Sequence, residues 1–174
     1  GLEAGQKGDF AGAIRELKPL AEKGDSPSQC LLGWVYKNVQ KGKLALTWIT
    51  RAAEQGNAHC QGTLGGMYMG ISGQSVEKDY AVGIKWLKKS ALNGNASGQF
   101  TLGMMYADGR GVAKSYRDAR KWYSLAAKQG LPIAQGYLKS LEQDILEEAK
   151  EQCIDMGFKI DTEKYDNCVT QMTN

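Results

Sequence analysis

The sequence contains a single histidine, three prolines and a net charge of only +3. A transmembrane helix needs roughly 20 consecutive apolar residues, and no run in this chain approaches that length, so we expect no membrane span. The single histidine, His59, rules out multi-histidine metal sites, and we expect no metal, no cofactor and no histidine-based catalytic triad. Because lysines and arginines are interleaved with acids and form no basic stripe, we expect no nucleic-acid partner.

Glycine, in contrast, is abundant, with 22 residues in 174, and four glycines end a recurring phrase. The phrase reads Leu-Ala-Glu-Lys-Gly at 20–24, Ala-Ala-Glu-Gln-Gly at 52–56, Ala-Leu-Asn-Gly at 91–94 and Ala-Ala-Lys-Gln-Gly at 126–130. Successive terminal glycines are 32, 38 and 36 residues apart. A period of this size is typical of solenoids built from stacked helix pairs.

Two further motifs keep a fixed distance from these glycines. The first three glycines are followed by Leu-Gly-x-x-Tyr, and a tryptophan precedes each of the last three, at Trp48, Trp86 and Trp122. In the third unit Asp79 is a good N-cap and Gly94 is suited to end the helix. Each unit therefore predicts two helices, with the three tryptophans in the core.

These spacings resemble the Sel-1-like repeat family over about residues 8–140. The resemblance implies an all-α fold, a right-handed α/α solenoid of about four helix pairs over residues 1–140. It also implies a non-enzymatic role in binding another protein in the bacterial envelope. The partner's identity stays open: the role is that of an adaptor in envelope assembly, or of an inhibitor such as an immunity protein against a secreted phospholipase toxin.

The repeat pattern decays after Leu138, and we expect residues 141–174 to form a helical hairpin that caps the solenoid. Its Cys153 to Cys168 segment is similar to a short module of exported bacterial proteins. These cysteines, 15 residues apart, flank Gly157, suited to end one helix, and Thr162, suited to cap the next. We expect a disulfide rather than two free thiols, and a periplasmic or secreted protein whose signal peptide has been removed.

The other two cysteines lie in the repeats. Cysteine-rich members of the family place a cysteine where this chain has Cys60, but its partner position seven residues earlier is occupied here by Ala53. We therefore expect Cys60 to be a small buried apolar side chain, and both Cys30 and Cys60 to be free thiols. A Cys30–Cys60 bridge between neighbouring helices is the lesser alternative.

The candidate binding site is a groove on the concave side of the solenoid. Aligning Leu-Gly-x-x-Tyr with related helical repeats identifies inward-facing positions, which are occupied by Trp34, Lys37, His59, Gly62, Gly66, Met69, Phe100 and Met104. Two bulky walls, one of Trp34 and one of Phe100 with Met104, flank a floor of Gly62 and Gly66, which suits a partner's helix or extended segment. The alternative is that Trp34 and Phe100 pack between neighbouring repeats.

An enzyme is the competing functional class. Ser75-Val-Glu-Lys78 fits the Ser-x-x-Lys motif of penicillin-binding enzymes, and a penicillin-binding or lactam-hydrolysing activity is suggested for cysteine-rich relatives. However, Val76, Lys78 and Asp79 already match the loop of the repeat, and the companion Ser-Asp-Asn and Lys-Thr-Gly motifs are absent. We therefore expect no catalytic residues, and turnover of a chromogenic lactam is the observation that would revive the alternative.

Overall fold

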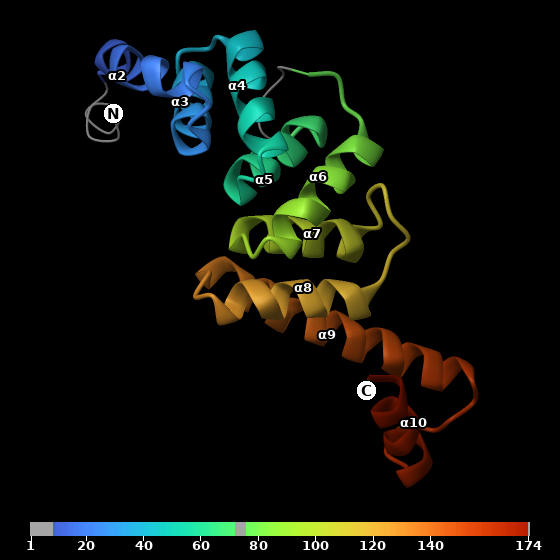
Figure 1. The fold of residues 1–174 in the computed structure, drawn as a ribbon. Helices are drawn as coiled ribbons and strands as arrows, with labels where there is room; N and C mark the ends of the chain where they lie inside the picture. Colours follow the sequence, from blue (N-terminus) through green and yellow to red (C-terminus); the bar gives the residue numbers. More distant parts are fainter. Residues whose placement is uncertain (1–8, 72–75, 174) are drawn as a thin grey trace.

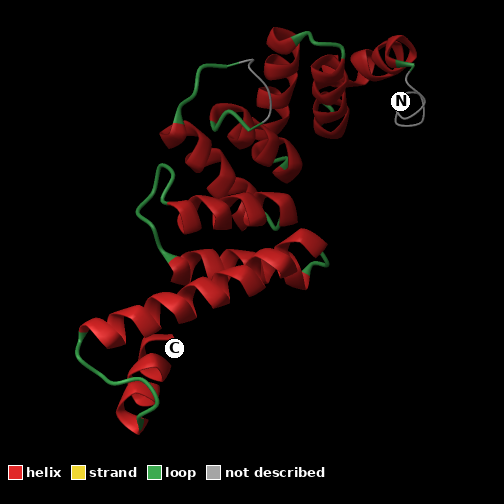
Figure 2. Cartoon of the chain, turned by 180° about the vertical axis from the view of Figure 1, so that it is seen from behind, coloured by secondary structure: helices red, strands yellow, loops and turns green. Residues whose placement is uncertain are grey.

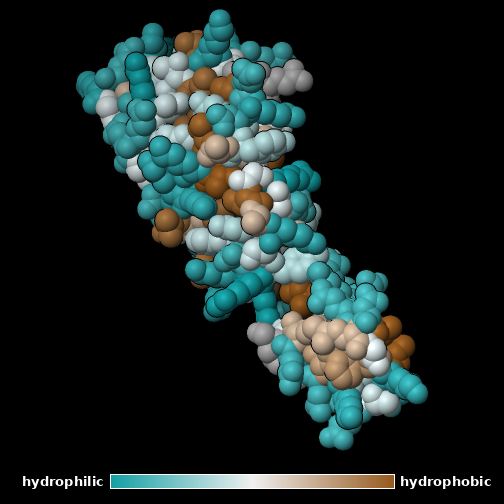
Figure 3. Space-filling view, turned by 90° about the vertical axis from the view of Figure 1, so that its right-hand side faces the viewer, coloured by the Kyte–Doolittle hydropathy of each residue, from teal (hydrophilic) through white to brown (hydrophobic). Residues whose placement is uncertain are grey.

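The computed structural model describes residues 9–71 and 76–173, and all regular secondary structure in these residues is helical. The helices form an elongated stack with α2 and α10 at opposite ends (Figure 1), and the view from behind shows the loops along its edges (Figure 2). The space-filling view shows the same elongated shape (Figure 3). The all-α solenoid prediction is confirmed. The helices are α2 (Phe10–Glu22), α3 (Ser26–Asn38), α4 (Gly42–Glu54), α5 (Ala58–Tyr68), α6 (Tyr80–Leu92), α7 (Ala96–Asp108), α8 (Tyr116–Lys128), α9 (Pro132–Asp155) and α10 (Glu163–Thr173).

Local sequence signals set the helix boundaries. Short polar side chains accept a hydrogen bond from the first-turn backbone, as Asp79 does from the Val82 N–H at 3.0 Å. The glycine that ends each recurring phrase adopts a left-handed conformation, with φ between 80° and 96° at Gly24, Gly56, Gly94 and Gly130. Glycine reaches this conformation without a Cβ clash, so the phrase recurs because every second helix must stop at the same point.

The glycine of Leu-Gly-x-x-Tyr lets the second helix of one repeat approach the first helix of the next repeat closely. A Cβ at Gly65 would lie 2.7 Å from Leu87 Cγ and 3.0 Å from the Gly83 carbonyl oxygen. Equivalent conflicts arise at Gly33 with Ile49 and at Gly103 with Tyr123. In the fourth unit this position is Lys139, which is exposed.

The three tryptophans differ in burial. Trp48 is 7% exposed and belongs to the core, as predicted, whereas Trp86 and Trp122 are half-buried at its edge. A cation lies over each ring, at centroid distances of 4.8 Å for Arg51 on Trp48, 4.6 Å for Lys89 on Trp86 and 5.4 Å for Lys121 on Trp122. The basic side chains thus cover the faces of the tryptophan rings that the core does not bury.

Buried glutamines link each repeat to the next. Gln61 is 3% exposed, donates to the Ala53 carbonyl oxygen at 3.0 Å, and accepts from the Asn93 amide at 2.9 Å. Gln29 and Gln99 make the same two bonds in their own repeats, with Gln55 and Gln129 as the donors from the following repeat. These bonds satisfy buried polar groups and fix the register between repeats.

The prediction for Cys60 is wrong, because Cys60 forms a disulfide with Cys30. The bridge joins α3 to α5, with a Cα–Cα distance of 5.8 Å across a sequence separation of 30. The preferred expectation rested on the missing partner within the repeat, and the structure has the lesser alternative, a bridge between stacked helices of successive repeats. With Cys153 joined to Cys168, the chain has no free cysteine.

The C-terminal hairpin is formed by the second half of α9 and by α10. Gly157 follows α9 with a φ of 90°, and Thr162 accepts a hydrogen bond from the Tyr165 N–H at 3.3 Å. Tyr165 and the disulfide between Cys153 and Cys168 form the small core of this hairpin. The α9 helix runs unbroken across the expected division at residues 140 and 141, and a separate domain there stays a prediction.

Candidate functional site

The exposed edges of α3, α5, α7 and α9 form one surface, which we call the groove face and define by its exposed residues Pro27, Trp34, His59, Ser97, Ile133 and Tyr137. Of the eight predicted groove residues, Trp34 and His59 are exposed. Lys37, Gly62, Phe100 and Met104 are partly buried, and Gly66 and Met69 are buried. The eight residues therefore divide between surface and interior, and their role in binding a partner stays a prediction.

A small gap lies in the middle of the groove face, between α5 and α7. It has a volume of about 160 Å³, and its lining includes His59, Gly62 and Gly66 from α5, with Gly98 and Thr101 from α7. The gap exists because glycines line both sides of the junction. The predicted glycine floor is thus open to the surface, but it is about one side chain wide rather than a long trough.

The neighbouring junctions on this face are filled. Between α3 and α5 the space is bridged by the Cys30–Cys60 disulfide. Between α7 and α9 it is filled by Phe100 and Tyr137, whose ring centroids lie 5.0 Å apart in an edge-to-face arrangement. The glycine junction therefore lies between two firmly packed ones.

Phe100 does not form a wall of the glycine gap. Its ring packs against Tyr123, at a centroid distance of 5.6 Å, and against Tyr137, so it faces the fourth repeat. Burial raises the pKa of Tyr123, and the nearby charges of Asp108 and Tyr137 raise it further. The exposed apolar groups at this end are instead Tyr137 and Ile133, which are 44% and 51% exposed.

Met69, which the sequence alignment placed in the groove, lies in the core. It is 5% exposed, and a Cβ at Gly83 would lie 2.9 Å from Met69 Cγ, so its side chain packs against α6 in the core. Met104 is partly buried and lines a different cavity of about 300 Å³ with Tyr137 and Asp144. At the other end of the face, Trp34 is 43% exposed and lies 6.4 Å from the Phe10 ring.

Ser90 of α6 supports the gap from behind. Its hydroxyl donates to the Ala58 carbonyl oxygen at 2.7 Å, and a Cβ at Gly98 would lie 2.8 Å from Ser90 Cβ. The second and fourth repeats have Ala52 and Ala126 in place of Ser90, opposite Cys60 and Ala134. The serine on α6 thus accompanies a glycine on α7, because the Ser90 hydroxyl leaves no room for a side chain at position 98.

This pairing predicts a compensating double substitution. Gly98→Ala should lower the free energy of unfolding by about 1 kcal/mol, because Ser90 must move and give up its hydrogen bond. Ser90→Ala with Gly98→Ala should recover part of that loss, because it removes the conflicting hydroxyl while keeping the Cβ, as in the alanine pair of the last repeat. Denaturant unfolding of the four proteins measures the coupling, and strict additivity of the two single changes would contradict it.

The described residues contain no candidate metal cluster and no candidate membrane-spanning helix. In residues 9–71 and 76–173 no three His, Cys, Asp or Glu side chains gather closely enough to hold a metal ion. Over the same ranges, none of the helices combines the length and the apolar character that crossing a membrane requires. Ser75 of the Ser-x-x-Lys motif lies outside the described residues.

Comparison with known proteins identifies the repeats. The Sel1 repeat matches residues 26–57, 59–95 and 96–131. Chitin synthase regulatory factor 3 of Schizosaccharomyces pombe is 34% identical over 134 residues, which is 74% of this chain but 14% of that protein. The chain therefore spans a small part of this curated relative.

Two solved structures share the fold. One is c5321, a protective antigen of uropathogenic Escherichia coli strains that displays an SLR fold, with a TM-score of 0.66 and 35% identity over 80% of this chain and 29% of that chain. The other is a Sel1 repeat protein from Oxalobacter formigenes, with a TM-score of 0.65 and 34% identity over 73% of this chain and 97% of that one. Sel1 repeats mediate protein binding and their family is usually non-catalytic. The three matched repeats cover most of the described solenoid, and the chain belongs to the Sel1 repeat family.

Proposed function

We propose that this protein binds a partner protein on its groove face. The observation that carries the proposal is the presence of exposed apolar side chains at both ends of this face, with Trp34 on the first repeat and Ile133 and Tyr137 on the fourth. Large aromatic groups dominate the energy of protein interfaces when a partner buries them. The gap at Gly62 and Gly98 lies between these anchors and has room for one side chain of the partner.

The two disulfides are typical of proteins that fold in an oxidising compartment outside the cytoplasm. We place this protein more narrowly in the periplasm or among secreted proteins. The similarity to c5321, a protective antigen, supports such a location. In that compartment the protein uses its groove face in one of two roles. It is either an adaptor in envelope assembly or an inhibitor of a secreted effector.

The test is capture of partners from a native envelope fraction, followed by affinity measurement with the captured protein. Trp34→Ala and Tyr137→Ala should each raise the Kd about tenfold, or about 1.4 kcal/mol, because each removes an aromatic side chain that the partner buries on binding. Ser97→Trp should block binding, since this exposed residue lies at the edge of the gap.

Leu92→Ala provides the matched control. Leu92 is 76% exposed on α6, outside the groove face, so its removal should leave the affinity unchanged. If a partner bound all three groove-face variants as tightly as the wild type, its binding site would lie outside the groove face. Equal weakening by Leu92→Ala would lead to the same conclusion.

A further inference from the structure

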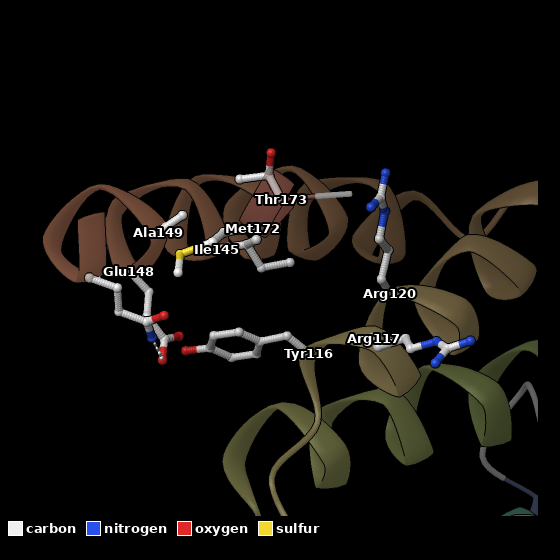
Figure 4. Close-up of a pocket in the computed structure, with 9 residues that line it drawn as sticks. Tyr116, Arg117, Arg120, Ile145, Glu148, Ala149, Met172 and Thr173 are labelled. Carbon is white, nitrogen blue, oxygen red and sulfur yellow. Dashed lines mark hydrogen bonds between the residues drawn. The ribbon is translucent and has the colours of Figure 1, made fainter. Parts of the chain in front are cut away.

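A second surface lies where the C-terminal hairpin leaves the stack. A cleft of about 480 Å³ is bounded by α8, α9 and α10, and we call it the hairpin cleft. Its apolar floor is formed by Ile145 and Ala149 of α9 and Met172 of α10 (Figure 4). The cleft has about three times the volume of the gap on the groove face and shares no lining residue with it.

The two ends of the hairpin cleft carry opposite charges. Figure 4 shows Arg117 and Arg120 extending from α8 at one end, while the Tyr116 ring points toward Glu148 at the other. At the acidic end the negative charge of Glu148 is partly balanced by Lys114. The Lys114 Nζ lies 4.3 Å from the centroid of the Tyr116 ring. A hydrogen bond with Tyr116 raises the pKa of Lys114, and the charges of Glu148 and Asp144 raise it further.

The basic end is only weakly compensated. Among the described residues no carboxylate lies within 4.0 Å of the Arg117 guanidinium. Arg120 meets Glu142 at 3.9 Å, with both side chains about half exposed, and a pair of that kind contributes little. Three residues apart on a helix, Arg117 and Arg120 lie on one face of α8, so two cations are available beside an apolar floor.

We infer that the hairpin cleft is a second docking site, which takes a segment of a partner protein carrying an apolar side chain next to one or two carboxylates. The apolar side chain packs on Ile145, Ala149 and Met172. The carboxylates meet Arg117 and Arg120, whose planar guanidinium groups bind carboxylates through two parallel hydrogen bonds.

The charges around the cleft favour such a segment over a polyanion or an anionic membrane. The α9 side of the cleft carries negative charge, because Glu148 lines the cleft and Glu142 lies 3.9 Å from Arg120 at its edge. A surface of phosphate groups would approach these carboxylates together with the arginines, and the like charges would repel. A peptide segment meets less of this repulsion, because its one or two carboxylates lie only beside Arg117 and Arg120.

The experiment uses the full chain and a defined probe. The probe is a set of end-blocked, fluorescein-labelled heptapeptides with one leucine and two aspartates in every arrangement, and the same set with asparagine for aspartate. Fluorescence anisotropy should show aspartate peptides that bind at least tenfold more tightly than their asparagine counterparts. Arg117→Gln with Arg120→Gln should abolish that difference, and added salt should weaken it.

The matched control is Lys85→Gln with Lys88→Gln, which removes the same charge from exposed positions of α6 and should preserve the difference. Ser97→Trp should also preserve it, which separates this site from the groove face. Three results would overturn the inference: no binding by the whole set, equal binding of aspartate and asparagine peptides, or equal loss in the lysine control. Arginine-dependent binding to phosphatidylglycerol vesicles instead of peptides would assign the cleft to a membrane surface.

Discussion

Replacement of Cys30 and Cys60 by alanine should lower the free energy of unfolding by about 3–4 kcal/mol. The bridge closes a loop with a sequence separation of 30 between the first two complete repeats, and its removal restores that loop's freedom to the unfolded chain. Both side chains are buried, so alanine also leaves a small void. Guanidinium unfolding followed by circular dichroism measures the loss.

The second disulfide provides the comparison. Cys153→Ala with Cys168→Ala opens a shorter loop, with a separation of 15, for which the same argument gives about 3 kcal/mol. That loss should be confined to the hairpin, whereas loss of Cys30–Cys60 loosens the stack itself. Thiol titration of the unfolded, unreduced protein should find no free thiol, and two free thiols would contradict the Cys30–Cys60 bridge.

The second large effect is expected at Gly65. Gly65→Ala should destabilise the protein by about 2 kcal/mol, because the new methyl group would lie against Leu87 and the Gly83 backbone and force α5 from α6. Gly136→Ala is the matched control, since it also lies within a helix but has no atom within 4 Å of its Cβ position. There alanine should stabilise by up to about 1 kcal/mol through helix propensity alone.

Thermal and denaturant unfolding of both variants test this contrast. If Gly65→Ala were as stable as Gly136→Ala, the glycine of Leu-Gly-x-x-Tyr would not be required by close packing.

The fold was predictable because its determinants recur. Gly24, Gly56, Gly94 and Gly130 end helices, and the Leu-Gly glycines bring helices together, so their spacing alone defines the helix pairs. The buried glutamines were also visible, since a glutamine follows each of these four glycines by five residues. We did not anticipate their role, because hydrogen bonding between repeats appears only when the repeats are stacked.

The candidate site was less predictable, because its residues do not recur. Phe100 was expected at the surface but meets Tyr123 and Tyr137 from the next repeat, contacts that depend on the stacking geometry. Extending the same alignment to the fourth unit would have found Ile133, three residues after Gly130, but not Tyr137, which lies one residue beyond the inward-facing position occupied by Gly136. The hairpin cleft had no sequence signal, since it depends on where α10 folds back.

Lys139 has a consequence for assembly. A helix pair from another molecule could stack on the N-terminal half of α9 only by approaching it as closely as α6 approaches Gly65 of α5. That contact would bury the Lys139 ammonium group and the Glu142 carboxylate. Burying charges without good partners is strongly unfavourable. Solenoid ends are otherwise prone to join head to tail, a contact that propagates without closing. These two charged residues therefore oppose polymerisation of the protein into filaments through this end.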